Sequence, residues 1–201
     1  MVGRLNDASA KHPTAFELAV FGWAWGNTAW AAGKSYLQAA LHLVDATEGP
    51  VLECGSGLST LLVGAALAHQ NRRLVSLEHD RAWYLRLCVV IERYRLTNID
   101  LRFAPLRDFG TYAWYDPEAL PAGMSFQLVL CDGPPGKTAG GRYGLVPLLG
   151  ERLARNAVIL LDDFQRSEDR RVALRWAAEW PAVVTPIEGA PDLALIRHRH
   201  P

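Results

Sequence analysis

One stretch of the chain decides its fold: Val51-Leu52-Glu53-Cys54-Gly55-Ser56-Gly57-Leu58-Ser59-Thr60. In it an apolar run ends in an acid, a glycine-rich turn follows, and a helix-like pattern begins. A second apolar run further along ends in Leu77-Glu78-His79-Asp80. In α/β proteins, ligands bind beyond the carboxyl ends of the strands, where acids can hold a nucleoside. The arrangement therefore favours a cofactor-binding enzyme over a generic globular domain.

Size and charge limit the classes of function. The 201 residues are enough for one domain with a sizeable core, and 50% of them are hydrophobic. Lys and Arg number 21 and so do Asp and Glu, so the formal net charge is zero. Broad nucleic-acid binding needs an excess of cations that displaces counterions. We therefore expect no nucleic-acid partner.

The location can also be anticipated from the sequence. The polar stretch 1–13 lacks the apolar core of a signal peptide, and no apolar run approaches the ~20 residues that span a bilayer. The cysteines Cys54, Cys88 and Cys131 show no metal-binding spacing and fit a reducing compartment. We expect a cytoplasmic protein with no membrane contact.

From residue 50 onward, apolar strand-like runs alternate with amphipathic helix-like runs, which predicts a mostly parallel sheet with helices on both faces. The expected strands are 51–54, 73–78, 99–104, 126–131, 157–161, 183–185 and 193–197. The expected helices are 59–69, 81–96, 142–153 and 167–180, with a loop from 105 to about 123. We predict a single domain over 1–201, comprising a Rossmann-like core over 49–201 and a helical N-terminal extension or lid over 1–48.

The N-terminal extension is rich in tryptophan, with Trp23, Trp25 and Trp30 close together. Core packing explains these residues most simply. A lid over the cofactor and a contact in a homodimer remain open, because tryptophan is enriched at interfaces.

The glycine turn indicates what kind of cofactor binds. Gly55 and Gly57 allow a tight turn and close approach of a ligand to the backbone, and Ser59 is expected to cap the next helix. In a dinucleotide fingerprint a third glycine would stand at position 60, which is Thr60. The acid Glu53 would repel a pyrophosphate but attract an amine or a sulfonium. S-adenosylmethionine carries both of these cations.

Glu78 is placed to hold the other end of such a cofactor. A carboxylate can accept hydrogen bonds from both hydroxyls of a ribose. The next residue, His79, is either a neighbour of the adenine or a polar residue that starts a loop.

With these residues the chain resembles the class I S-adenosylmethionine-dependent methyltransferases over about residues 35–197. The resemblance rests on 52–60, on Ser76-Leu77-Glu78-His79-Asp80, on the stretch 126–136 that contains Cys131-Asp132-Gly133-Pro134-Pro135, and on Ile159-Leu160-Leu161-Asp162-Asp163. It implies a doubly wound, seven-stranded, mostly parallel sheet whose last strand is antiparallel. The ending of the glycine turn is most similar to small-molecule O-methyltransferases of the catechol type.

The resemblance also implies roles for individual residues. Asp132 would lie beside the transferable methyl group as the catalytic residue, Glu78 would hold the ribose, and Leu106 would lie near the adenine. The whole implied cofactor site is Glu53, Gly55, Ser56, Gly57, Ser59, Glu78, His79, Leu106 and Asp132.

Catechol-type enzymes hold a divalent cation, and the matching positions here are Asp132, Asp162 and Asp163. Oxygen ligands suit Mg²⁺ or another hard divalent cation. The alternative is that Asp132 contacts the cofactor alone and that Asp162 or Asp163 caps the next helix.

A Gly/Pro-rich segment beyond Asp132 carries Lys137, Arg142 and Tyr143. These residues would bind an anionic group of the acceptor, or else form a solvated loop. The leading functional hypothesis is methyl transfer to a small-molecule acceptor, at a hydroxyl. Two alternatives are a non-catalytic protein that binds S-adenosylmethionine and a NAD-dependent oxidoreductase, against which Glu53 and Thr60 count.

Overall fold

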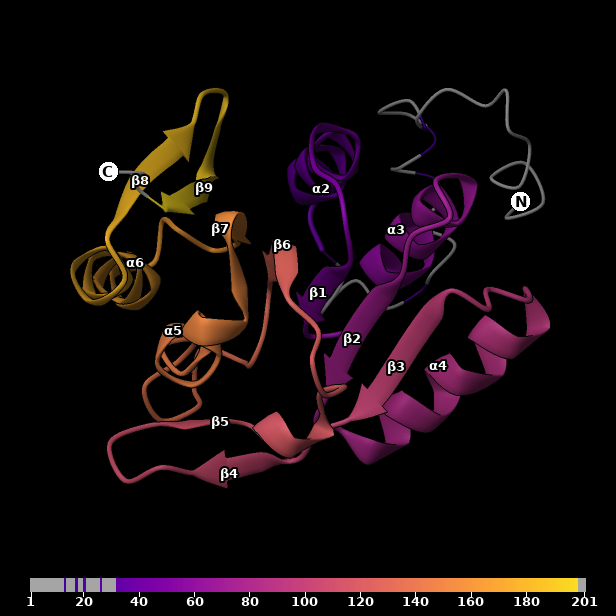
Figure 1. The fold of residues 1–201 in the computed structure, drawn as a ribbon, viewed down its shortest axis with the longest axis horizontal. Helices are drawn as coiled ribbons and strands as arrows, with labels where there is room; N and C mark the ends of the chain where they lie inside the picture. The colour runs from indigo at the N-terminus through magenta and orange to yellow at the C-terminus, as the bar shows by residue number, and fades with distance from the viewer. Residues whose placement is uncertain (1–12, 14–16, 18–19, 21–25, 27–31, 199–201) are drawn as a thin grey trace.

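The computed structural model describes residues 32–198 of the chain, together with positions 13, 17, 20 and 26. A seven-stranded sheet in the order β3-β2-β1-β6-β7-β9-β8 forms its centre (Figure 1). Neighbouring strands from β3 to β7 are parallel, whereas β9 is antiparallel to both β7 and β8. The expected antiparallel last strand is therefore confirmed. The strands are β1 (Val51–Cys54), β2 (Leu74–Glu78), β3 (Ile99–Phe103), β6 (Phe126–Cys131), β7 (Leu153–Leu161), β8 (Ala182–Ile187) and β9 (Ala190–His198).

Helices cover both faces of the sheet, so the fold is doubly wound. They are α2 (Lys34–Ala46), α3 (Leu58–His69), α4 (Arg81–Arg93), α5 (Leu145–Leu149) and α6 (Ser167–Glu179). Val51 of β1 belongs to a core shared with α2 and α3, whereas the next residue, Leu52, belongs to a core shared with α5 and α6. Burial on both faces explains why the strands are continuous apolar runs rather than alternating ones.

The segment expected to be a loop, 105–123, contains regular structure. A two-stranded hairpin pairs β4 (Leu106–Asp108) with β5 (Ala113–Tyr115), and a short 3₁₀ helix, η2, follows at Pro117–Ala119. The hairpin has a core role because Trp114 and Tyr115 are fully buried. Its strands are three residues long, and periodicity over so short a run carries little signal.

The expected helix 142–153 was too long at both ends. Helix α5 begins only at Leu145, a 3₁₀ turn, η3, spans Gly150–Arg152, and β7 already begins at Leu153. Pro147 has no N–H to donate to the carbonyl of Tyr143, so the helix cannot extend back to that residue. The Tyr143 carbonyl instead accepts a hydrogen bond of 2.8 Å from the indole N–H of Trp176.

Most of the predicted N-terminal extension, including Trp23, Trp25 and Trp30, lies outside the described residues. Of the predicted extension, α2 is described, and it packs on α3, β6 and β9. None of the helices in the described part of the chain is both long and apolar enough to cross a membrane.

Candidate active site

The loops after β1 and β6 touch at two glycines. Gly55 has a φ of +91°, and a Cβ placed on it would lie 3.1 Å from the backbone nitrogen of Gly133. The N–H groups of Asp132 and Gly133 both donate to the carbonyl of Cys54, at 3.1 and 2.6 Å. The absence of side chains at 55 and 133 therefore brings the glycine turn and Asp132 together at one edge of the sheet.

Glu53 is a fully buried acid under the glycine turn. Its Oε2 accepts hydrogen bonds of 2.6 Å from the hydroxyls of Thr60 and Ser76. Its Oε1 has no hydrogen-bond partner among the described residues. Burial raises the pKa of Glu53 to about 7, even though the hydrogen bonds from Ser76 and Thr60 oppose the shift.

Thr60, which stands where a dinucleotide fingerprint would place a glycine, has a structural task. Its hydroxyl accepts a hydrogen bond of 2.8 Å from the N–H of Gly57 and donates to Glu53. Gly57 is the N-cap of α3, which begins at Leu58. The expectation that Ser59 caps this helix was wrong, because the turn ends two residues earlier and Ser59 lies inside the first turn, where it is buried.

Glu78 ends β2 with both carboxylate oxygens engaged. Oε2 accepts from the hydroxyl of Ser56 at 2.5 Å, and Oε1 accepts from the N–H of Asp80 at 2.7 Å. The Nδ1 atom of His79 lies 3.2 Å from Oε1. Burial alone would raise the pKa of Glu78, but the interactions with His79, Ser56 and Asp80 hold it below its usual value. Glu78 is thus an anion that already binds a hydroxyl.

His79 and Leu106 are both neighbours of one aromatic residue, Tyr115. The rings of His79 and Tyr115 are 6.0 Å apart in an edge-to-face arrangement. Leu106 is the strand partner of Tyr115 in the β4–β5 hairpin. The structure therefore brings together the two residues that the resemblance placed near the adenine, and Tyr115 joins them.

A three-carboxylate cluster lies beyond β6 and β7. One oxygen each of Asp132, Asp162 and Asp163 lie within 4.8 Å of one another. Burial, followed by the negative charge of Asp132, raises the pKa of Asp162 to about 8. The N–H of Asp163 donates to Asp162 Oδ1 at 2.8 Å, and Asp163 itself has a φ of +59°. Neither residue is in a helix, because α6 begins at Ser167.

Arg142 is buried behind this cluster with 1% of its surface exposed. Its Nη2 donates to Asp163 Oδ2 at 2.8 Å and lies 3.2 Å from Asp132 Oδ1. Its Nη1 donates to the Asp162 carbonyl at 2.8 Å and to Asp169 Oδ1 at 3.1 Å. The guanidinium is therefore bonded to protein groups rather than facing an open loop.

The other two residues proposed for the acceptor differ from each other. The Tyr143 hydroxyl donates to the carboxylate of Glu179, and the guanidinium carbon of Arg175 lies 3.6 Å from the centre of the Tyr143 ring. Lys137 is exposed. Of the three residues expected to bind an anion, Lys137 is thus the one whose side chain faces solvent.

Sequence reasoning missed Tyr36, which lies in the first turn of α2. It is fully buried, and its hydroxyl has no hydrogen-bond partner among the described residues. Burial, and then the charges of Asp132 and Glu53, raise the pKa of Tyr36 well above its usual value. The hydroxyl is therefore a protonated donor beside two acids of the site. No local signal separates it from the other apolar-face positions of its helix.

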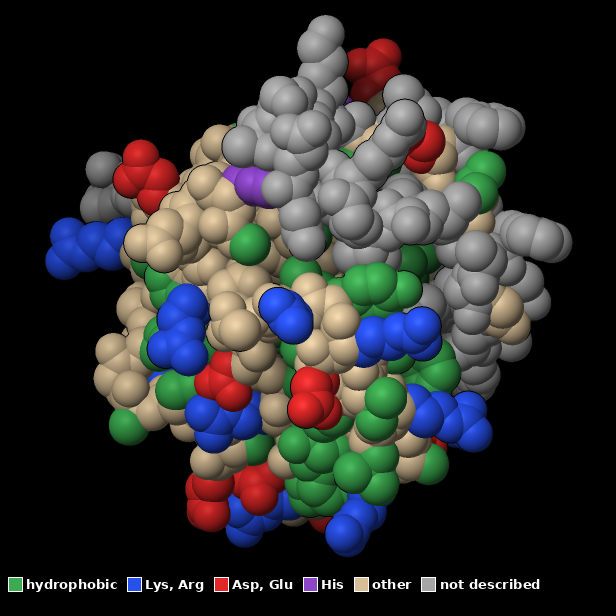
Figure 2. Space-filling view, turned by 90° about the vertical axis from the view of Figure 1, so that its right-hand side faces the viewer, with side chains coloured by type: hydrophobic (Ala, Val, Ile, Leu, Met, Phe, Trp, Pro, Cys, Tyr) green, Lys and Arg blue, Asp and Glu red, His purple; other side chains and the backbone are tan. Residues whose placement is uncertain are grey.

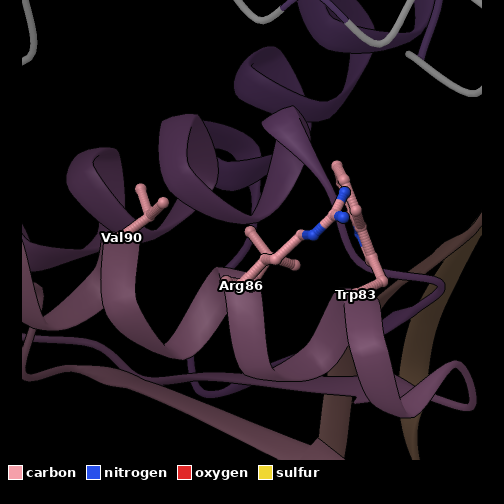
Figure 3. Close-up of a pocket in the computed structure, with 4 residues that line it drawn as sticks. Trp83, Arg86 and Val90 are labelled. Carbon is pink, nitrogen blue, oxygen red and sulfur yellow. The ribbon is translucent and has the colours of Figure 1, made fainter.

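A separate hollow of about 190 Å³ lies on α4 and is lined by Trp83, Arg86, Leu87 and Val90 (Figure 3). The indole N–H of Trp83 donates to the carbonyl of Ser56 at 3.0 Å, so the hollow adjoins the glycine turn. Figure 3 shows the Arg86 side chain extending along the helix toward Trp83. On this side of the molecule, basic, acidic and hydrophobic side chains are interspersed (Figure 2). The hollow is smaller than the roughly 300–1,000 Å³ of typical ligand pockets.

No family model matches the chain, and no curated protein matches its sequence. Solved structures do match. An SAH-bound methyltransferase from Podospora anserina aligns with 99% of this chain and 94% of its own, with a TM-score of 0.71 and 16% identity. Cofactor-bound Rv0187 from MTB aligns with 100% and 97%, with a TM-score of 0.66 and 21% identity. An O-methyltransferase from Bacillus cereus in complex with SAH aligns with 95% and 93%, with a TM-score of 0.64 and 17% identity.

These likenesses establish the fold of the chain, which is that of the class I S-adenosylmethionine-dependent methyltransferases. The sequence resemblance to that class implied the same sheet, with the same antiparallel last strand.

Proposed function

We propose that this protein is an S-adenosylmethionine-dependent methyltransferase whose acceptor is a hydroxyl group of a small molecule. The observation that carries the proposal is the placement of three acids at adjacent strand ends. Strand β1, which carries Glu53, pairs with β2, which ends in Glu78, and with β6, which Asp132 directly follows. The glycine turn follows β1 at the same ends of the strands. Such a row of carboxylates suits a ligand with two cationic groups and a ribose.

Two buried polar atoms without a hydrogen-bond partner in the described chain are complementary to the amino-acid end of the cofactor. Glu53 Oε1 is a buried acceptor without a partner, and the Tyr36 hydroxyl is a buried donor without a partner among the described residues. Leaving either group unpaired costs about 1–3 kcal/mol. An ammonium and a carboxylate would satisfy them. At the other end, the ribose hydroxyls would exchange with the Ser56 hydroxyl on Glu78.

The acidic cluster also fits a divalent cation. In full ionisation, the four carboxylates Asp132, Asp162, Asp163 and Asp169 with the two guanidiniums of Arg142 and Arg166 carry a net charge of −2. One divalent cation would balance that charge. Asp132, Asp162 and Asp163 would hold it through oxygen ligands of the kind that Mg²⁺ prefers. Such an ion would stabilise the developing oxyanion of the acceptor.

The bound cofactor supplies an electrophilic methyl group on a sulfonium. The chain aligns the acceptor oxygen with that methyl group, which lowers the barrier by up to about 7–11 kcal/mol. As the oxygen–carbon bond formed and the sulfur–carbon bond broke, the hydroxyl proton would pass to Asp132. Burial raises the pKa of Asp132, which makes its carboxylate a better base.

Calorimetric titration with S-adenosylmethionine, SAH and NAD tests the cofactor assignment. We expect the first two to bind and NAD not to bind. Glu78→Ala should lower the affinity at least tenfold, because the ribose hydroxyls lose their acceptor. Glu151→Ala is the matched control, since Glu151 is exposed in η3, which directly precedes β7 and so lies at the end of that strand away from the site. Binding of NAD alone would refute the proposal.

Catalysis needs its own test, because binding without transfer would describe a non-catalytic protein. Transfer from radiolabelled S-adenosylmethionine is measured across a panel of small hydroxylated molecules, with wild type and Asp132→Ala. We expect wild type to label at least one acceptor and the variant to lose most of that rate. If the variant keeps the full rate, Asp132 is not the catalytic residue.

A further inference from the structure

The buried guanidinium of Arg142 bonds to several protein groups at the carboxyl ends of the strands. Three separate segments meet on it: Asp132 after β6, the pair Asp162-Asp163 after β7, and Asp169 of α6. These segments are distant in sequence, with Asp132 ten and Asp169 27 residues from Arg142. The side chain thus fixes the relative positions of three pieces of backbone.

In each of the three carboxylates, one oxygen accepts a hydrogen bond from an N–H group of the protein. Arg142 Nη2 reaches Asp132 Oδ1 and Asp163 Oδ2, while the N–H of Asp163 holds Asp162 Oδ1. The exposed side chain of Arg166 adds a second contact to Asp163 Oδ2 at 2.6 Å. Hydrogen bonds from N–H groups in the described chain therefore reach one oxygen of each of the three carboxylates, and the Asp132 and Asp162 carboxyls also hydrogen-bond to each other.

A second observation indicates that a ligand is missing from this region of the described chain. The Tyr36 hydroxyl is fully buried and has no hydrogen-bond partner among the described residues, and burial, then the charges of Asp132, Glu53 and Asp162, raise its pKa. It approaches from α2, on the face of the sheet opposite to the α5–α6 side. A buried donor of this kind normally has a partner. The Tyr36 hydroxyl is therefore a donor that lacks an acceptor in the described chain, as it would if a bound ligand supplied one.

We propose that Arg142 is the positioning residue of a preformed divalent-cation site, holding one oxygen of Asp132 and one of Asp163 so that their other oxygens, with Asp162, converge on the ion. The inference rests on the metal-assisted form of the proposed function. A planar guanidinium reaches several acceptors at once, so Arg142 would affect cation binding by orienting the carboxylates that hold the ion. A point charge at the same place would not do so.

Two substitutions separate positioning from charge. Arg142→Lys keeps the charge but cannot span the same acceptors, and Arg142→Gln removes the charge. If Arg142 acted only as a charge, its loss would strengthen the binding of a cation. Positioning predicts weaker binding in both variants. The probe is Mn²⁺, titrated into the full chain and followed by electron paramagnetic resonance, with thermal unfolding measured on every sample.

We expect both variants to bind Mn²⁺ at least tenfold more weakly than wild type. Arg152→Lys is the matched control. Arg152 is also a partly buried arginine that donates to loop carbonyls, those of Met124 and Pro121, but it does so at the opposite end of β6 and β7. This control should bind Mn²⁺ as wild type does, whatever it loses in thermal stability.

A third variant covers the case in which substitution of Arg142 prevents folding. Asp169→Glu keeps every charge but lengthens the side chain that anchors Arg142 Nη1 at 3.1 Å. We expect it to weaken Mn²⁺ binding about threefold to tenfold. The inference is overturned if folded Arg142→Lys binds Mn²⁺ with an affinity within twofold of wild type. If Arg142→Lys does not fold, the same result for Asp169→Glu overturns it.

The result is also distinguishable from failure of the proposed function. If wild type binds SAH but shows no Mn²⁺ binding at millimolar concentration, the inference is wrong while the cofactor assignment stands. If wild type binds Mn²⁺ in the manner described but binds no SAH, the cation site stands and the methyltransferase assignment fails.

Discussion

The hydroxyl of Thr60 donates a hydrogen bond of 2.6 Å to Oε2 of Glu53, an acid that is completely removed from solvent. Burial raises the pKa of Glu53 from its ordinary value of 4.5 to about 7. The folded state therefore holds the Glu53 proton more tightly than the unfolded state does. By linkage, the stability that this group contributes falls as the pH rises from 4.5 to 7 and is level beyond.

The first prediction concerns that pH window. The shift corresponds to about 3 kcal/mol, so Glu53→Gln should gain roughly this much stability relative to wild type between pH 4.5 and pH 7. Denaturant unfolding of both proteins across this range gives the difference directly. Glu151→Gln, an exposed substitution, should show no such trend. If the difference in free energy of unfolding between wild type and Glu53→Gln does not vary with pH, the pKa of Glu53 is not raised by folding. Glu53 would then be ionised at neutral pH.

The second prediction concerns the contact between Gly55 and Gly133. Gly55→Ala places a Cβ at a φ of +91° and 3.1 Å from the nitrogen of Gly133, so both strain and overlap oppose it. We expect a loss of about 2–5 kcal/mol in the free energy of unfolding. Gly57→Ala is the matched comparison, because its Cβ would meet nothing within 4 Å of the described residues. Equal losses in the two variants would contradict the close approach.

The third prediction separates stability from binding at Tyr36. Tyr36→Phe removes a buried hydroxyl that lacks a partner in the described chain, so stability should rise by about 1 kcal/mol. If the hydroxyl donates to the cofactor, the affinity for SAH should fall about tenfold in the same variant. Thermal unfolding and calorimetry measure the two effects. Tyr94→Phe serves as the control, because Tyr94 is 37% exposed at the end of α4. Unchanged SAH affinity would remove Tyr36 from the binding site.

The fourth prediction links cation binding to protons. The pKa of Asp162 is raised to about 8 by burial and by the charge of Asp132, so below pH 8 a cation must displace a proton. Mn²⁺ affinity should therefore rise with pH, by up to about tenfold per unit, and level off above pH 8. Titrations in buffers of different ionisation enthalpy count the protons released. Affinity that is constant from pH 6 to pH 9 would mean that Asp162 is not a ligand.

Local signals were sufficient for the sheet and for its acidic edge. Apolar runs ending in Glu53, Glu78 and Asp132 are visible in sequence, because buried parallel strands need continuous apolar residues. The hairpin around Trp114 was not visible, since its strands are too short for periodicity to register. Arg142 was placed on the correct edge, but its burial depends on partners ten to 27 residues away. Tyr36 resembles any other apolar-face position of a helix.

The hydrogen bond between Ser56 and Glu78 has a consequence for the release of a ligand from Glu78. The Glu78 carboxylate accepts a hydrogen bond from the hydroxyl of Ser56, so the departure of a ribose-bearing ligand would leave no buried anion without a partner. Release of such a ligand would then exchange one hydroxyl for another on the Glu78 carboxylate, with little change in the number of hydrogen bonds. Under the proposed function, the Ser56 hydroxyl would therefore keep Glu78 paired between one cofactor molecule and the next.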